Sequence, residues 1–298
     1  MPTSPALLPA LALTANALVW GTSWWPFRQL QAMGLHPLWS TVIVYLLAVA
    51  VIAALRPRAF AQVLRAPALW VLVLASGATN AAFNWGVVIG DVVRVVLLFY
   101  LMPLWAVLLA RWLLKEPLTR AAGLRVALGL AGAAIVLWPE GVGGTASLPL
   151  PRSLADWLGL AGGFSFALNN VMLRREAHRS QEARAMAMFL GGVLVAGVLA
   201  WALAANAHIE WPPHAQPAWL ALAVALAALF LFSNLCLQYG AGRLPANVTA
   251  VVMLGEVVFA SASAVLWGGE QLSDSLLVGG TLIVSAALLA ATGRSPGH

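Results

Sequence analysis

Charged residues are scarce in this 298-residue sequence, where lysine, arginine, aspartate and glutamate together make up 9% of the chain. Soluble proteins carry roughly 25%. Hydrophobic residues reach 62%, and the mean hydropathy is +0.89. A soluble domain needs a charged surface, and disordered chains and coiled coils need many polar residues. The composition excludes these classes and predicts an integral membrane protein.

Cysteine and clustered metal ligands are also missing. The single cysteine, Cys236, lies in an apolar segment, so no intrachain disulfide is possible. The five histidines fall between apolar segments or at the chain end, and no carboxylates cluster with them. The sequence has no Gly-x-x-x-x-Gly-Lys phosphate loop, no Gly-x-Ser-x-Gly elbow and no His-Glu-x-x-His motif. We therefore predict no metal, no cofactor and no enzymatic activity.

Long apolar segments are what the sequence has instead. Only helices and closed barrels satisfy their backbone hydrogen bonds in lipid, and the alternation of barrel strands is missing here. The segments are near 20 residues, the length of one helical span. They predict an all-α integral membrane protein with ten transmembrane helices, at about 6–27, 38–55, 68–89, 92–114, 121–138, 154–173, 185–205, 217–239, 246–268 and 275–292.

The basic residues are divided unevenly between alternate loops. The isoelectric point near 10.7 would suggest a nucleic-acid partner in a soluble protein, but here the charges follow the topology. The positive-inside rule places both termini in the cytoplasm of a multi-pass protein. Three basic residues fall on the outer side, Arg28, Arg94 and Arg152. Thirteen fall on the side of the N-terminus: Arg56, Arg58, Arg65, Arg111, Lys115, Arg120, Arg125, Arg174, Arg175, Arg179, Arg184, Arg243 and Arg294.

Scarce residues repeat along the chain. A shift of 154 residues pairs Asn80 with Asn234, Asn84 with Gln238, and Glu116 with Glu270, and a shift of 146 pairs Trp20 with Phe166 and Arg28 with Arg174. We therefore expect two repeats, 1–140 and 141–298. Five helices per repeat is an odd number, so the second repeat is inverted in the membrane. Carriers built this way hold their substrate near mid-membrane, between the halves.

Several motifs together carry a family resemblance. Trp20-Gly21 is followed by Arg28, and Leu101-Met102-Pro103-Leu104-Trp105 precedes Glu116-Pro117-Leu118-Thr119. The second half has Glu270-Gln271-Leu272-Ser273, with Val257 in place of the proline. The chain resembles the EamA-type members of the drug/metabolite transporter superfamily, and within them the bacterial aromatic amino-acid exporters of the YddG type.

This resemblance implies a secondary transporter that exports aromatic and other neutral amino acids across the bacterial inner membrane by alternating access. An exporter of drugs or other metabolites on the same fold is the alternative, and a non-carrier, either a membrane enzyme or a scaffolding subunit, is the third possibility. The small residues Gly129, Gly132 and Ala133 are compatible with an internal helix contact or a dimer face, so monomer and homodimer both stay open.

Amides inside the apolar segments are the first candidate substrate ligands. Asn80 and Asn84 share one helical face, and Asn234 and Gln238 repeat the pair. Four amides suit a neutral site for a zwitterion, although such residues also join helices in membranes. Further candidates of the same kind are Asn16, Asn169 and Asn170.

Ionisable residues inside spans form a second group. Glu256 is the only carboxylate well within a segment, so it is a candidate to carry a proton, to bind a substrate ammonium group or to pair with a buried polar group. Asp91 and Arg94 are three residues apart and are expected to pair, with Arg94 as an alternative ligand for a substrate carboxylate at the outer mouth. Glu116 and Glu270 are expected to cap turns.

Aromatic residues form the third group. Trp20, Trp24 and Phe27 share a helical face and can stack on a planar substrate, as can Tyr100 and Trp105. Interfacial anchoring and core packing are the alternative roles. Gly21, Pro26 and Pro103 are expected to let these helices bend.

Overall fold

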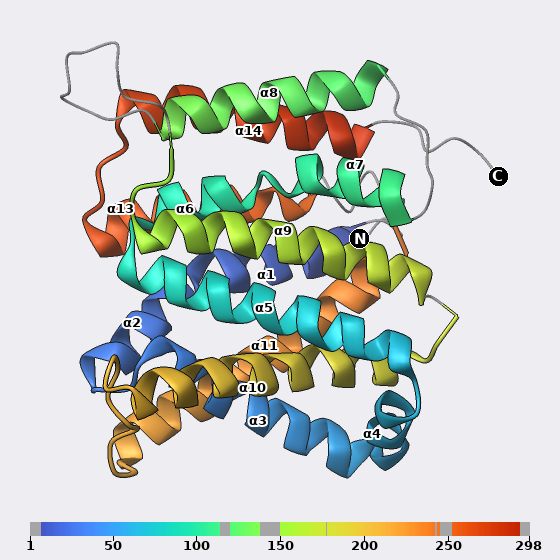
Figure 1. Ribbon diagram of the computed structural model, residues 1–298, viewed down its shortest axis with the longest axis vertical. Helices are drawn as coiled ribbons and strands as arrows, with labels where there is room; N and C mark the ends of the chain where they lie inside the picture. Colours follow the sequence, from blue (N-terminus) through green and yellow to red (C-terminus); the bar gives the residue numbers. More distant parts are fainter. Residues whose placement is uncertain are drawn as a thin grey trace.

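The computed structural model describes residues 7–113, 120–137, 150–176, 178–241, 243–244 and 252–292 (Figure 1). Every regular element among them is a helix. The first half contains α1 (Leu7–Thr22), α2 (Trp24–Ala32), α3 (Pro37–Leu55), α4 (Pro57–Leu64), α5 (Pro67–Ile89), α6 (Val92–Phe99), α7 (Met102–Leu113) and α8 (Arg120–Val136). The second half contains α9 (Leu154–Arg175), α10 (Gln181–Ala205), α11 (Pro217–Ala241), α13 (Gly255–Gly268) and α14 (Asp274–Thr292).

The long helices coincide with the apolar segments, and two of those segments are interrupted. The first breaks at Ser23, between α1 and α2. The fourth breaks at Tyr100 and Leu101, shortly before Pro103. Proline has no backbone N–H and its ring clashes with the carbonyl group four residues earlier, here that of Phe99, which explains the second break. The short helix α4 follows Arg56 in a stretch where the sequence indicated only a loop.

Corresponding helices of the two halves run in opposite directions. When each helix is followed by colour in Figure 1, one set runs from right to left, namely α1, α5, α8, α10 and α13. The other set runs from left to right, namely α3, α6, α7, α9, α11 and α14. Thus α1 opposes its counterpart α9, α3 opposes α10, and α5 opposes α11. The packing follows the same relation, because α5 contacts α9 and α10 while α11 contacts α1 and α3. This is the arrangement expected of inverted repeats.

The loops collect at two ends of the bundle. We call the end where α3 stops and α5 and α10 begin the basic end, because Arg56, Arg65, Arg179 and Arg184 lie there. The opposite end contains the loops after α2, α5 and α13 (Figure 1). The assignment of the basic end to the cytoplasm stays a prediction.

The outside of the bundle is apolar. Large hydrophobic side chains are exposed along the long helices, including Leu74, Val198 and Leu235. Five helical stretches among the described residues are long and apolar enough to cross a membrane, namely Pro37–Leu55, Pro67–Ile89, Val92–Leu113, Gln181–Ala205 and Pro217–Leu237. Exposed apolar surface of this extent suits contact with lipid. The full count of ten spans stays a prediction.

The two halves approach closely where α5 crosses α10. A Cβ atom on Gly191 would lie 2.1 Å from the carbonyl oxygen of Val73, and one on Gly77 would lie 2.3 Å from the carbonyl oxygen of Gly191. Backbones come this close only where neither helix carries a side chain, as in other membrane helix pairs. The crossing thus fixes how the halves dock.

We predict that Gly191→Ala destabilises the protein by about 1–3 kcal/mol, the usual cost of overpacking a tight contact. Gly197→Ala on the same helix is the control, because its Cβ would lie 3.6 Å from the Val42 side chain, an ordinary contact. Thermal unfolding of the purified protein in detergent measures both variants. Equal melting temperatures would show that the α5–α10 crossing is not tight.

Candidate functional site

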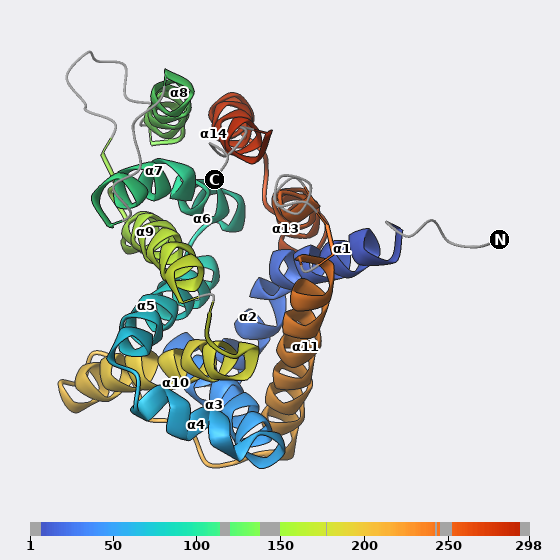
Figure 2. The same ribbon diagram turned by 90° about the vertical axis from the view of Figure 1, so that its right-hand side faces the viewer.

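A cavity lies between the two halves, near the middle of the long helices. Its wall is formed by helices of both halves, namely α1, α3, α5 and α6 of the first and α9, α10, α11 and α13 of the second. Figure 2 shows these helices around the centre of the bundle. The lining residues are Asn16, Trp20, Tyr45, Ser76, Thr79, Asn80, Phe83, Phe99, Phe166, Asn169, Met188, Phe189, Phe230, Asn234, Leu237, Met253 and Glu256.

Aromatic side chains form a continuous wall along this cavity. The rings of Trp20 and Phe230 stack with centroids 4.8 Å apart, and those of Phe83 and Phe99 meet edge to face at 4.9 Å. Tyr45 contacts Phe230 at 5.7 Å. Further contacts extend the series in the order Phe189, Tyr45, Phe230, Trp20, Phe83, Phe99 and Phe166. Such a wall can pack against a planar ring and can attract a cation to the ring faces.

The amides of the cavity differ in how well they are satisfied. Asn80 accepts a hydrogen bond from the Tyr45 hydroxyl at 2.7 Å and donates to the Ser76 carbonyl oxygen at 2.9 Å. Asn16 donates to the side chain and backbone of Ser233, but its own Oδ1 has no partner in the described structure.

Asn169 is the least satisfied amide of the cavity. It is only 1% exposed, and its Oδ1 atom has no hydrogen-bond partner among the described residues. A buried amide oxygen left without a partner costs about 1–3 kcal/mol. Asn169 is therefore suited to bind a polar group of a ligand.

Glu256 is the only charged residue among the described cavity-lining side chains. It lies in the first turn of α13 and is 8% exposed. The Tyr100 hydroxyl donates to its Oε2 atom at 3.0 Å and lies 3.2 Å from the Met253 carbonyl oxygen, so it can donate to only one of them at a time. The cavity therefore contains a carboxylate that is bound by a neutral partner and by no cation within the described structure.

Several residues expected at the site lie elsewhere. Trp24 on α2 is buried against α13, where its Nε1 atom donates to the Ser263 hydroxyl at 2.9 Å. Asn84 is fully buried and donates to the Thr41 hydroxyl at 3.1 Å. Asn170 is exposed on the outer surface of α9. Tyr100 lies behind the cavity wall, where it contacts the lining residues Glu256, Met253 and Phe99. The side chain of Gln238 and all of Glu116 lie outside the described residues.

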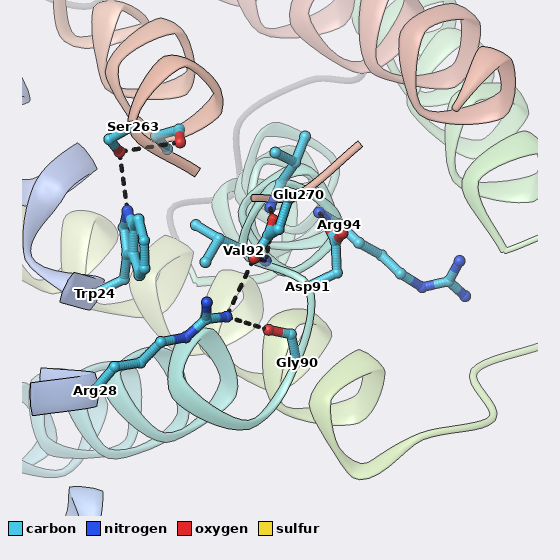
Figure 3. Close-up of polar contacts among 10 residues, drawn as sticks. Trp24, Arg28, Gly90, Asp91, Val92, Arg94, Ser263 and Glu270 are labelled. Atoms are coloured by element: carbon cyan, nitrogen blue, oxygen red, sulfur yellow. Dashed lines mark hydrogen bonds and ion pairs between the residues drawn. The ribbon is translucent and has the colours of Figure 1, made fainter. Parts of the chain in front are cut away.

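The expected side-chain pair of Asp91 with Arg94 is not formed. Asp91 caps α6 by accepting the backbone N–H of Arg94 at 2.7 Å. The Arg94 guanidinium instead makes two bonds to Asp156 in α9, at 2.7 and 3.2 Å, and a third to the Val136 carbonyl oxygen. It turns away from Asp91 in Figure 3. This pairing joins residues far apart in the sequence, so spacing along one helix could not reveal it.

A second ion pair joins the halves at the same end of the bundle, also beside the start of α6. The Arg28 guanidinium lies 3.2 Å from Glu270 and donates to the Gly90 carbonyl oxygen at 2.7 Å (Figure 3). Glu270 also accepts the backbone N–H of Val92 at 3.0 Å, so it caps the N-terminus of α6. Capping was the role expected of Glu270, but the helix it caps belongs to the other half. Burial raises the pKa of this carboxyl, and the Val92 N–H and Arg28 oppose the rise.

We predict that Glu270→Gln lowers the free energy of unfolding by about 1.5–3 kcal/mol, the usual worth of hydrogen bonds to a charged group. Thermal unfolding in detergent measures the loss. Arg56→Gln is the control, because its contact with Glu182 is exposed and 3.9 Å long, and such pairs contribute about 0–1 kcal/mol. Losses of the same size in both variants would contradict a special role for the Arg28–Glu270 pair.

Six aromatic residues of the cavity were not identified from the sequence as site residues, namely Tyr45, Phe83, Phe99, Phe166, Phe189 and Phe230. Aromatic side chains on membrane helices also face lipid, so composition does not separate the two groups. Among these six, only Phe166 was indicated by the sequence, because the repeat shift pairs it with Trp20.

The fold and the cavity define a multi-pass helical membrane protein with a site enclosed by two oppositely oriented halves. A model of the EamA-like transporter family matches residues 7–138 and again 153–292, so the chain belongs to that family. One solved crystal structure shares the fold, with a TM-score of 0.56 and 22% identity over 95% of this chain and 96% of the other. No match was found among curated proteins.

Members of this family belong to the drug/metabolite transporter superfamily and are transporters rather than enzymes. Among the described residues, no group of histidine, cysteine, aspartate or glutamate could hold a metal ion.

Proposed function

We propose that the protein is a secondary transporter that exports amino acids, aromatic and other neutral ones, across the bacterial inner membrane, as the YddG-type branch does. The observation that supports this most is the composition of the cavity wall. An aromatic amino acid needs a flat apolar surface for its ring, a negative partner for its ammonium group and hydrogen-bond donors for its carboxylate. The aromatic wall offers the first feature and Glu256 the second. The Asn169 amide can donate from its Nδ2 atom to the carboxylate, while its unpaired Oδ1 atom can only accept a hydrogen bond and suits the ammonium group.

An exporter of cationic drugs is the second candidate, and a specific feature favours it. The described lining of the cavity contains a carboxylate but no arginine or lysine to bind the carboxylate of an amino acid. Aromatic rings together with one carboxylate are also what a hydrophobic cation requires. Both substrate classes therefore carry a positive group, and only the amino acids also carry a negative group that the site must bind.

Counterflow in proteoliposomes separates the two candidates. Vesicles loaded with unlabelled phenylalanine should accumulate labelled phenylalanine in a saturable way, and threonine should compete. Phenylethylamine, which lacks the carboxylate, should compete poorly if amino acids are the substrates. Strong competition by phenylethylamine and hydrophobic cations, with no exchange of any amino acid, would favour the drug exporter.

We predict that Asn169→Ala weakens the apparent affinity for phenylalanine about 10-fold, in line with the loss of a hydrogen bond to a charged group. Asn170→Ala is a matched control, because this neighbouring asparagine is exposed and lies outside the cavity. Counterflow at varied substrate concentration measures both variants. Equal apparent affinities in the two variants would remove Asn169 from the site.

Glu256→Gln tests the carboxylate with little change of shape. If Glu256 binds the ammonium group or carries a coupled proton, we expect transport to fall at least about 10-fold, corresponding to 1.4 kcal/mol or more. The exposed Glu182→Gln serves as the control. If both variants transport at the wild-type rate over the same pH range, Glu256 has only a structural role.

A further inference from the structure

A second hollow lies at the basic end, away from the cavity between the two halves, which we call the transport cavity. It is formed between α4 of the first half and the turn that joins α9 to α10 in the second. Its lining is mostly polar or basic and consists of Gln62, Arg65, Ala66, His178, Arg179, Ser180 and Ala183. None of these residues lines the transport cavity.

Helix α4 has three distinct faces. Ala59 and Val63, four residues apart, are buried against the bundle. Phe60 and Leu64 are 39% and 52% exposed on the next face. Arg58 and Gln62 occupy the third face, and Arg65 follows the helix. A short helix with a buried, an apolar exposed and a basic face is typical of a segment that lies in the membrane interface.

The hollow carries excess positive charge. Arg179 pairs with the buried carboxylate of Glu176, which also lies 4.0 Å from Arg175 and 3.9 Å from His178. Arg65 on the other wall is exposed and makes no ion pair among the described residues. The Glu176 carboxylate is therefore shared by several basic groups of the hollow, and the positive charge of Arg65 can bind an anion from outside the chain.

The two walls of the hollow are held together. The Ser180 hydroxyl donates to Gln62 Oε1 at 2.7 Å, which connects α4 to the start of α10. Ser180 is also the N-cap of α10, since its hydroxyl accepts the backbone N–H of Ala183. The first turn of this 25-residue helix therefore faces the hollow and adds positive electrostatic potential, which the exposed carboxylate of Glu182 in the same turn, 3.9 Å from Arg56, partly offsets.

We propose that this hollow binds the phosphate group of an anionic phospholipid. Arg65 supplies a charge that is unpaired within the described structure, and Arg179 lies on the facing wall in an ion pair with Glu176. The Gln62 side-chain amide supplies a hydrogen-bond donor, its Nε2 atom, while its Oε1 atom is held by the Ser180 hydroxyl.

The exposed Phe60 and Leu64 favour a lipid over a free phosphate, because they place apolar surface beside the headgroup for the acyl chains. Basic pockets near the membrane interface recognise lipid headgroups in this way. The bound lipid contacts both halves of the transporter, so it stabilises their docking at this end.

Thermal unfolding of the detergent-solubilised full chain tests the site. Addition of phosphatidylglycerol is expected to raise the melting temperature by several degrees more than phosphatidylcholine with the same acyl chains. Arg65→Gln should abolish this difference, because it removes the charge without a partner. Arg111→Gln should retain it, since Arg111 is also exposed but lies on α7, outside the hollow.

The controls separate the possible outcomes. In phosphatidylcholine, Arg65→Gln should have the same melting temperature as the wild-type protein, which would show that the variant folds. A shift that persists in Arg65→Gln, or that is lost equally in Arg111→Gln, would overturn the site and indicate a general effect of basic charge. A full shift with inorganic phosphate alone, and no further effect of phosphatidylglycerol, would overturn the assignment to a lipid.

Discussion

Several buried polar side chains in this bundle find their partners across the interface between the two halves. Asn16 of α1 donates to Ser233 of α11, Trp24 donates to Ser263, and Tyr100 donates to Glu256. Lipid gives apolar helix faces little reason to associate, so close packing and hydrogen bonds of this kind must hold the halves together. The tight α5–α10 crossing supplies the packing.

Within the cavity this pairing is incomplete, and that is the reason to regard it as a binding site. Asn169 is buried without a described partner for its amide oxygen, and Glu256 has only a neutral donor. At the bundle end opposite the basic end, by contrast, two ion pairs join the halves, Arg94 with Asp156 and Arg28 with Glu270. Ion pairs at this end, and a carboxylate and an amide oxygen without such partners in the centre, suit a carrier that binds its substrate in the centre.

The sequence predicted the helices well because the apolar segments and their prolines set the helix ends. It also pointed to Trp20, Asn80, Asn169, Asn234 and Glu256, which all line the cavity, since a polar or bulky residue inside such a segment is conspicuous. It misplaced Trp24 and Asn170, because the rotation of a helix that is apolar on every side cannot be read from its pattern. Partners such as Asp156 and most of the aromatic wall depend on contacts between distant segments, which no local spacing encodes.

The central claim is that substrate binds between the halves, next to Asn169. The most direct test places a cysteine there, with Asn169→Cys introduced after Cys236→Ser has removed the native thiol. The rate of labelling by N-ethylmaleimide is then measured with and without saturating phenylalanine. We predict that phenylalanine slows labelling at position 169 and leaves labelling of a cysteine at position 170 unchanged. If phenylalanine is transported but has no effect on labelling at position 169, the substrate binds elsewhere and the account is wrong.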